Sequence, residues 1–478
     1  MEGIGYALLN SWHIIYYIPP ESRLLIMQAQ KHEKCEGIKM RKATVDTILQ
    51  PEWIVPIEPH NTVLENHSIV IDQGRIVALL PRVEAENLYE ANTHLRLADH
   101  IVMPGLMNSH AHSPMVLFRG MADDLGLMDW LNNHIWPAET QWMNEEFMRD
   151  GTELAILEML RSGTTCFNEN YFFGEVTAET AVIAGIRAVV GAEVINLPTQ
   201  YAGTMDEYLT KMEIFCQQWR GHPLIKPTIH PQGPYTVSDD DFLQVKAFAD
   251  EQELIIHTHL HETLDEINGS IQQYHKRPVQ RLYDLGLFSE RLVCVHMCHV
   301  NEEDLAILQA TRPQIVHSPE SNLKLASGFC PVKKIMTAGI NVALGTDGAA
   351  SNNDLDMFGE MRTAAILAKA VAQDSTALNA AEALQMATLN GARAFGLERE
   401  IGSIQPGKSA DLIAIDLSAV NTQPIYHPIS QLVYAVNSRQ VSDVWVAGQR
   451  LLKNGEFTTL DAEAILAKAR KWRKKIRG

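Results

Sequence analysis

The sequence has few cysteines and little positive charge. Its six cysteines are scattered over 478 residues, which excludes the small disulfide-rich secreted proteins and predicts a reducing, cytoplasmic location. Lys and Arg number 40 against 58 Asp and Glu, so the formal net charge is −18. Because binding to nucleic-acid phosphates requires a cationic surface, we expect no nucleic-acid partner.

Long apolar runs and glycine-rich phosphate loops are also missing. No stretch of about 18 uncharged apolar residues occurs, so no membrane span is predicted. No Gly-x-Gly-x-x-Gly turn follows the first apolar run, which argues against a doubly wound dinucleotide-binding sheet. The composition, 46% hydrophobic and 21% charged, is that of an ordinary globular enzyme.

The two ends of the chain share a pattern of short apolar runs broken by turns. This pattern covers residues 40–100 and 395–478, and it predicts one small β-sandwich domain built from both ends, with a helix at the C-terminus. Residues 1–39 precede it as an N-terminal extension, and the sequence does not decide whether they belong to the functional protein.

Between these ends, residues 101–394 alternate strand-like apolar runs with helical stretches. Such alternation predicts an α/β fold with parallel strands, and the length of this region fits a (β/α)8 TIM-like barrel. The expected strands include residues 164–168, 186–194, 225–230, 254–260, 292–300, 315–317 and 340–344.

A His-x-His pair follows the first apolar run of this region. His110 and His112 stand two residues apart, so on a strand their side chains face the same side. At the end of a barrel strand that side is the mouth of the barrel, where two imidazoles can share one cation. A single His-x-His motif also occurs by chance in sequences that bind no metal.

Three histidines and an acid follow another apolar run. His257, His259 and His261 are in phase on an ideal strand, so periodicity alone does not choose a third metal ligand among them. Glu262 comes just past the strand, where a carboxyl group can move a proton without binding the metal.

Two more polar side chains end apolar runs. His296 follows Leu292–Val295, and Asp347 follows Val342–Thr346. A neutral imidazole can hydrogen-bond the reacting centre, although a buried core histidine gives the same pattern. A buried carboxylate is unfavourable unless a cation or hydrogen bonds compensate it, and a helix N-cap is the alternative for Asp347.

The joint occurrence of these histidines and Asp347 at the ends of several predicted strands makes the signal for a metal site specific. Nitrogen and oxygen ligands without thiolates indicate a catalytic zinc site that keeps a position for water, although iron or manganese accepts similar donors. We expect one divalent metal per subunit, Zn²⁺ before the others.

The motifs in this order resemble the amidohydrolase superfamily, and within it the 5′-methylthioadenosine/S-adenosylhomocysteine deaminase branch, which is related to the triazine chlorohydrolases. The resemblance covers roughly residues 43–476. It is carried by PGLMNSHAH at 104–112, FRGMADD at 118–124, HLHE at 259–262, SNLKL at 321–325 and GTDGAASNN at 345–353.

The resemblance implies a hydrolytic deaminase with assigned residues. Its metal ligands would be His110, His112, His259 and Asp347. Glu262 and Asp347 would move protons, and His296 would hold the developing hydroxyl. The nucleoside would be bound by Glu139, Trp130, Gln232, Ser351 and Glu262.

Three of the assigned binding residues have a simpler interpretation. Trp130 fits a helix core, Glu139 could cap the segment after Pro137, and Ser351 fits a turn. We predict a small-molecule nucleoside substrate, and the sequence does not decide whether the chain forms a homo-oligomer.

Two departures from the family pattern bear on the substrate. Gln232 stands where many members have a histidine, and an amide carries no charge. No Arg or Lys lies between Arg187 and Lys211, where some members have arginines for the homocysteine carboxylate, and selecting a carboxylate requires a fork of donors. The sequence therefore favours 5′-methylthioadenosine over S-adenosylhomocysteine, with adenosine as a further candidate.

Other activities remain open. The same metal centre serves deaminases or dechlorinases of guanine, cytosine and triazine rings. A catalytically silent binding protein on the same barrel is the alternative from another class, and Gln232 would then mark decay of the site.

Overall fold

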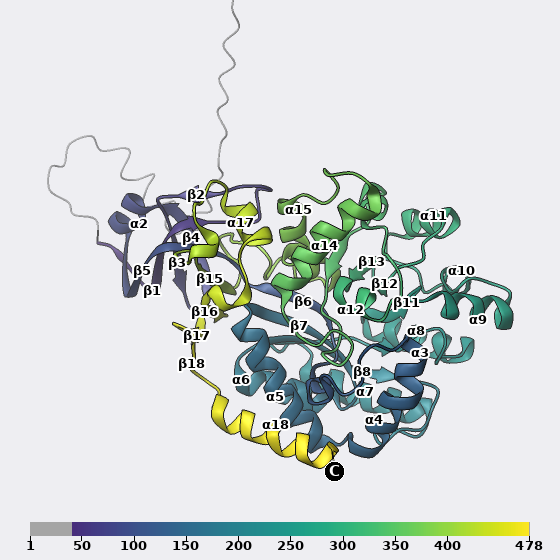
Figure 1. Ribbon diagram of the computed structural model, residues 1–478. Coiled ribbons are helices and arrows are strands. Elements are labelled where there is room, and N and C mark those ends of the chain that lie inside the picture. The colour runs from purple at the N-terminus through teal and green to yellow at the C-terminus, as the bar shows by residue number, and fades with distance from the viewer. Residues whose placement is uncertain (1–40, 478) are drawn as a thin grey trace, which may run out of the picture.

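The computed structural model describes residues 41–477. The predicted extension at 1–39 lies outside the described residues. Figure 1 shows two groups of strands, a sheet built from both ends of the chain and a helix-covered strand core formed by the middle of the chain.

Strands from the two chain ends form one nine-stranded sheet. Its order is β18-β17-β16-β15-β5-β1-β3-β4, with β2 beside β1. β5 lies in the middle, parallel to β1 and antiparallel to β15, and thereby joins the ends. The strands are β1 (Ala43–Ile54), β2 (Leu64–Glu65), β3 (His67–Asp72), β4 (Arg75–Pro81), β5 (Tyr89–Pro104), β15 (Leu412–Asp416), β16 (Val441–Val446), β17 (Gln449–Lys453) and β18 (Glu456–Phe457).

A two-residue turn connects β3 to β4, and it contacts residues that flank β15 and β16 near the other end of the chain. Gln73 and Gly74 both have positive φ, 49° and 76°, as a tight hairpin turn requires. A Cβ on Gly74 would lie 2.4 Å from the Ala447 carbonyl oxygen, so only glycine fits there. The Gly74 carbonyl in turn accepts a hydrogen bond from the Ala410 amide.

The middle of the chain forms two parallel sheets. Their orders are β10-β8-β7-β6, with β9 beside β8, and β11-β12-β13-β14. Each of the seven predicted runs overlaps at least one of these strands. They are β6 (Leu106–Ala111), β7 (Thr164–Tyr171), β8 (Arg187–Val194), β9 (Ile225–Pro227), β10 (His230–Pro231), β11 (Ile256–Leu260), β12 (Leu292–His296), β13 (Gln314–His317) and β14 (Val342–Leu344).

Backbone hydrogen bonds connect these two sheets at both margins. On one side the Ile229 amide donates to the Ile255 carbonyl over 3.1 Å, and the His257 amide donates to Ile229 over 3.0 Å. On the other side the Asp347 amide donates to the His110 carbonyl over 2.9 Å. The carboxyl ends of the strands in both sheets consequently open toward one region.

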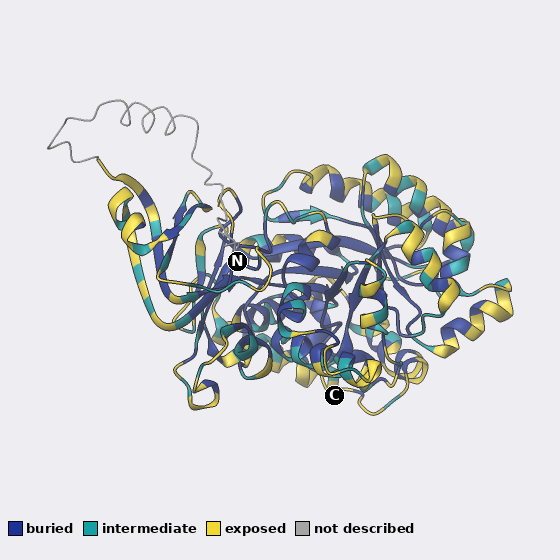
Figure 2. Ribbon diagram, turned by 90° about the horizontal axis from the view of Figure 1, so that it is seen from above, coloured by how far each residue is buried: buried dark blue, intermediate teal, exposed yellow. Residues whose placement is uncertain are grey.

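Helices surround this strand core, and Figure 2 shows their buried inner and exposed outer faces. Several begin at side-chain caps, as Asn144, Thr204 and Ser238 accept backbone N–H bonds. The helices of residues 41–477 are α2 (Arg82–Leu88), which lies against β3 and β4 of the sheet from the chain ends, and α3 (Leu127–Trp130), α4 (Trp136–Trp142), α5 (Glu145–Arg161), α6 (Gly174–Ala184), α7 (Met205–Trp219), α8 (Asp239–Gln252), α9 (Leu264–Tyr274), α10 (Pro278–Asp284), α11 (Glu302–Thr311), α12 (Pro319–Lys324), α13 (Val332–Thr337), α14 (Met357–Ala372), α15 (Ala380–Met386), α16 (Leu389–Ala394), α17 (Pro428–Tyr434) and α18 (Ala462–Arg477).

The basic C-terminal helix α18 packs along α5 (Figure 1). The Trp472 indole donates to Asp150 over 2.9 Å, and Lys468 pairs with Asp150 and Glu153. Lys468, one of the basic residues of α18, therefore contributes to the packing of α18 against α5. Among residues 41–477, no helix has the length and apolar character needed to cross a bilayer.

Candidate active site

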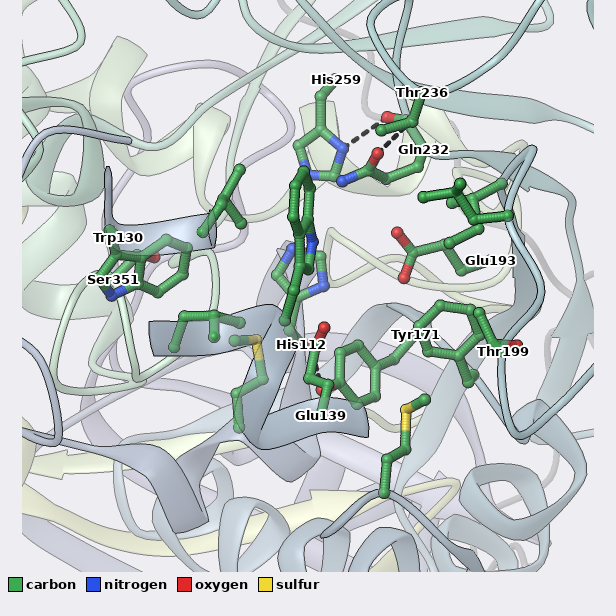
Figure 3. A pocket seen from close by; sticks show the side chains of 18 of the residues that line it. His112, Trp130, Glu139, Tyr171, Glu193, Thr199, Gln232, Thr236, His259 and Ser351 are labelled. Atoms are coloured by element: carbon green, nitrogen blue, oxygen red, sulfur yellow. Dashed lines mark hydrogen bonds between the residues drawn. The ribbon is translucent and has the colours of Figure 1, made fainter. Parts of the chain in front are cut away.

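A cavity of about 430 Å³ opens at the carboxyl ends of the strands. Figure 3 shows His112 and His259 near its centre, with Trp130 and Ser351 on one side and Glu193 and Thr199 on the other. This volume lies in the range of small-molecule sites.

The His-x-His pair and the strand-end aspartate meet at the base of this cavity. His110 is the penultimate residue of β6, His112 comes just beyond that strand, and Asp347 follows β14. The Nε2 atoms of His110 and His112 lie 3.4 and 3.3 Å from Asp347 Oδ1. Asp347 has a φ of 65°, a strained backbone of the kind that clusters at functional sites.

His259 and His296 complete the cluster. One nitrogen each from His110, His259 and His296 lies within 4.8 Å of the others, and the same limit holds for His110, His112 and Asp347. Backbone carbonyls orient two of the rings, because His112 Nδ1 donates to Asn170 and His259 Nδ1 donates to Gln232 over 2.7 Å. Their Nε2 atoms are left for a ligand, the arrangement of metal-binding histidines.

The cluster suits a divalent cation. His110 is fully buried, and neither of its ring nitrogens has a hydrogen-bond partner within residues 41–477, which is costly without a compensating ligand. Burial lowers the pKa of His110 to about 4, although Asp347 opposes the shift. At His112 burial also lowers the pKa, but Asp347 and nearby carboxylates outweigh it and raise the pKa to about 9. Imidazole nitrogens with one carboxylate are donors that zinc accepts.

Glu262 and His296 lie side by side next to this cluster. Glu262 Oε2 is 3.7 Å from His296 Nε2, and Ser327 donates to Glu262 Oε1 over 3.2 Å. His296 Nδ1 donates to Asn322 Oδ1 over 2.8 Å, which leaves Nε2 facing the cavity. Burial raises the pKa of Glu262, while His296 opposes the rise, so the carboxyl group is suited to hold and release a proton.

The two neighbouring histidines of β11 lie elsewhere. His257 is buried beneath the cluster, its ring stacked 5.1 Å from that of His110, and it does not line the cavity. His261 accepts a hydrogen bond from the Val279 amide and lies 3.6 Å from Asp304. Of the three, only His259 lines the cavity.

The predicted nucleoside-binding residues all line the same cavity. Trp130 is 6% exposed, at the end of α3, and the Tyr171 hydroxyl donates to Glu139 Oε1. Burial raises the pKa of Glu139 to about 7, although the Tyr171 hydrogen bond and His112 oppose it. Ser351 shares a hydrogen bond with Ser321, whose hydroxyl also contacts Asp347 over 2.7 Å.

Gln232 has a position that sequence reasoning did not foresee. Its backbone carbonyl accepts the His259 ring N–H, and its side-chain oxygen accepts a hydrogen bond from Thr236. The backbone contact needs no particular side chain. The amide nitrogen of Gln232 lies 3.5 Å from the Tyr235 hydroxyl. Tyr235 and Thr236 thus hold the Gln232 side chain in place where it lines the cavity.

Sequence reasoning missed Glu193, Tyr171 and Asn170. Glu193 is the penultimate residue of β8 and lines the cavity, and the carbonyl of Asn170 orients His112. The available signal was their position at the carboxyl ends of the predicted strands, since polar residues there face the mouth of a barrel.

Known proteins resemble this chain over most of its length. The amidohydrolase family profile matches residues 101–451. The chain belongs to the amidohydrolase family. A 5-methylthioadenosine/S-adenosylhomocysteine deaminase of Teredinibacter turnerae is 46% identical over 91% of this chain and 98% of its own length, and one of Saccharophagus degradans is 44% identical over 91% and 98%.

A solved structure agrees in fold and sequence. An adenosine deaminase from Xanthomonas campestris with bound zinc superposes with a TM-score of 0.90 at 50% identity, over 91% of this chain and all of that one. Membership in the amidohydrolase family confirms the predicted family, the hydrolase class and the TIM-barrel fold.

Proposed function

We propose that this chain is a zinc-dependent hydrolytic deaminase of adenine nucleosides, with 5′-methylthioadenosine as the first substrate and adenosine and S-adenosylhomocysteine as further candidates. The observation that carries the proposal is the position of Glu262 and His296 beside the cluster of His110, His112 and Asp347, at the base of a nucleoside-sized cavity. The relatives' names support the substrate class.

His110, His112, His259 and Asp347 would hold the metal. A bound zinc ion lowers the pKa of its water to about 7 and so supplies a nucleophile at neutral pH. Asp347 would accept the proton that the attacking water loses when the oxygen of that water bonds to C6 of the adenine ring. Ser321 donates to Oδ2 of Asp347 and would keep the carboxylate oriented for that transfer.

Glu262 would protonate ring N1, then take the proton of the new C6 hydroxyl and pass it to the departing amine, so that a C6=O bond forms, the C6–N bond breaks and ammonia leaves. The proton held by Asp347 would then return to Glu262. The raised pKa of its buried carboxyl group suits a proton donor. His296 would hold the developing hydroxyl through Nε2, because Asn322 occupies its Nδ1. Glu139, Trp130, Gln232 and Ser351 would bind the nucleoside.

We also propose a closed barrel and a β-sandwich as the finer features of the fold. The backbone hydrogen bonds at both margins of the two parallel sheets support a closed (β/α)8 barrel over 101–394. A shared apolar cluster that includes Leu49, Ile76 and Trp445 supports a β-sandwich built from 40–100 and 395–478. We retain the cytoplasmic location as a prediction from the scattered cysteines.

Ammonia release by zinc-loaded protein tests the function. We expect turnover of 5′-methylthioadenosine and adenosine, little with guanine or cytosine, and no chloride release from a chlorotriazine. Removing the metal with a chelator should abolish activity, and zinc should restore it. Absence of turnover with every adenine nucleoside at full zinc occupancy would contradict the proposal and favour a silent binding protein.

Glu262→Gln is the matching variant. It keeps the shape of the side chain but removes the proton, so kcat should fall by about 10²–10⁴-fold while the zinc content stays that of the parent protein. Glu290→Gln, on an exposed residue, is the control and should retain full activity.

A further inference from the structure

The turn that carries Glu262 begins with a strained residue. His261, directly after β11, has a φ of 55°, a left-handed conformation that is uncommon for residues other than glycine. This conformation turns the chain sharply before Glu262 and so sets the direction in which the Glu262 side chain leaves the backbone. A strained backbone of this kind persists only where the surrounding structure holds it.

A buried carboxyl group binds the backbone of this turn. Glu266, in the first turn of α9, is 8% exposed. Its Oε1 accepts the amide of His261 over 2.9 Å, and its Oε2 accepts the amide of Glu262 over 2.8 Å. The two oxygens therefore fix both peptide groups that lead into Glu262.

Two other helices show what an acid at this position ordinarily does. Glu266 is the third residue of its helix, and the side chain of the cap residue Thr263 accepts its amide. In α11 and α15 the acid at the same place, Asp304 or Glu382, accepts the amide of the cap residue itself, as in the usual capping box. Glu266 reaches past Thr263 to the two preceding amides, which belong to the turn and not to the helix.

The turn has little other support for the direction of Glu262. The His261 carbonyl accepts the Cys298 amide over 2.9 Å. The Glu262 side chain has one hydrogen-bond donor within residues 41–477, Ser327 at 3.2 Å. The position of the Glu262 carboxyl group beside His296 thus depends largely on how its backbone is held.

We propose that Glu266 is a positioning residue for the deamination: by binding the amides of His261 and Glu262 it keeps the Glu262 carboxyl group beside His296, where that group can transfer protons. This inference rests on the proposed deaminase function and deepens it. Glu266 does not line the cavity, so it acts through Glu262 and not through contact with the substrate.

The two hydrogen bonds do not depend on the charge of Glu266. Burial raises the pKa of Glu266 to about 8, although the amides of His261 and Glu262 oppose the rise. A protonated carboxyl group keeps acceptor capacity beside its one O–H, so both amides can still be bound. The nitrogen of a glutamine side chain only donates. Glu266→Gln therefore keeps the size of the side chain and loses one of the two hydrogen bonds.

Steady-state kinetics with adenosine on the zinc-loaded enzyme test the proposal. In Glu266→Gln, kcat should fall by about 10–100-fold, as a misplacement of a reacting group by about 1 Å gives, while KM and zinc content stay close to the parent values. The control is Glu382→Gln, the same substitution at the same helix position in α15, which should keep the parent kcat. A parent-like kcat in folded, zinc-loaded Glu266→Gln would overturn the proposal.

A double variant separates positioning from a general loss of structure. If Glu266 acts through Glu262, replacing it should lower kcat by less than about twofold once Glu262→Gln has removed the group that transfers the protons. Losses that multiply when Glu262→Gln and Glu266→Gln are combined would show that Glu266 acts on another part of the enzyme, contrary to the proposal.

A crystal structure separates this inference from the proposed function. If the zinc-loaded parent protein turns over no adenine nucleoside, the deaminase proposal fails, and the position of the Glu262 carboxyl group can still be compared between the parent and Glu266→Gln. We expect this group to move by about 1 Å or more away from His296 in the variant. An unmoved Glu262 would disprove the positioning role independently of catalysis.

Discussion

At the carboxyl end of the barrel strands the fully buried His110 has no hydrogen-bond partner at either ring nitrogen within residues 41–477. At the amino end of β8, the buried Arg187 is fully engaged. Its guanidinium binds both oxygens of Asp411 at 2.8 and 3.2 Å, the Ser409 hydroxyl at 3.1 Å and the Pro223 carbonyl at 2.6 Å. Asp411 also accepts the Ala447 amide.

The two regions use buried polar groups for different purposes. The Arg187 network joins the barrel to the sheet formed by the chain ends, and its groups satisfy one another. The ring nitrogens of His110 have no such partners among the described residues, as the proposed metal site requires. Mutations at the two ends should therefore separate activity from stability.

The largest expected effect is on activity, at Asp347. Asp347→Asn removes the proton acceptor and weakens metal binding, so kcat/KM for adenosine should fall by about 10⁴-fold or more. The free energy of unfolding of the metal-free protein should fall little, because a buried charge is also removed. A chemical denaturation curve recorded with a chelator present measures this free energy of unfolding. A large loss of stability would contradict the separation of activity from stability between the two ends of the barrel.

The next effect is on stability, at Arg187. Arg187→Met leaves Asp411 buried and unpaired, and it should lower the free energy of unfolding by about 3–5 kcal/mol. The kcat of the folded fraction should stay within about twofold of the parent value. The double variant with Asp411→Leu serves as the control and should recover part of the loss, since it removes the unpaired charge. A kcat lowered in proportion to stability would show that the two ends are coupled.

A smaller effect is expected behind the site, at Asn322. Asn322→Ala removes the acceptor of His296 Nδ1, so the ring can turn and kcat should fall by about 10–100-fold, as for other residues that orient a site histidine. Asn322→Asp keeps an acceptor and should lose less. Zinc content measured in parallel should be unchanged in both variants, and a loss of zinc would assign Asn322 to the metal site instead.

The smallest effect concerns Thr236, which donates to the Gln232 side chain. Thr236→Val should raise KM for adenosine by about 2–10-fold with little change in kcat, because one neutral hydrogen bond is lost. Thr337→Val, on the exposed face of α13, is the matched control. A KM that stays at the parent value would show that Gln232 needs no support from Thr236.

Much of the barrel could be predicted from sequence because its strands are continuous apolar runs. β8 coincides with such a run, β12 covers the first part of the predicted run 292–300, and Glu193 and His296 at the carboxyl ends of these two strands line the cavity. β10 is only two residues long, and no periodicity can be recognised at that length. The pairing of β5 with both β1 and β15 depends on contacts between distant parts of the chain.

The sequence by itself determined the candidates of the site. His110, His112 and Asp347 follow from strand ends and residue chemistry, which are local properties. Only the tertiary structure decided which atoms meet. Periodicity left the choice among His257, His259 and His261 open, the family resemblance named His259, and the tertiary structure places His259 at the cavity. The structure also shows that the backbone carbonyl of Gln232 orients the His259 ring and that the Glu193 carboxyl group accepts no hydrogen bond from residues 41–477. These outcomes depend on the register between neighbouring strands and on the strained turns that follow those strands. No single segment of the sequence determines the register or the turns.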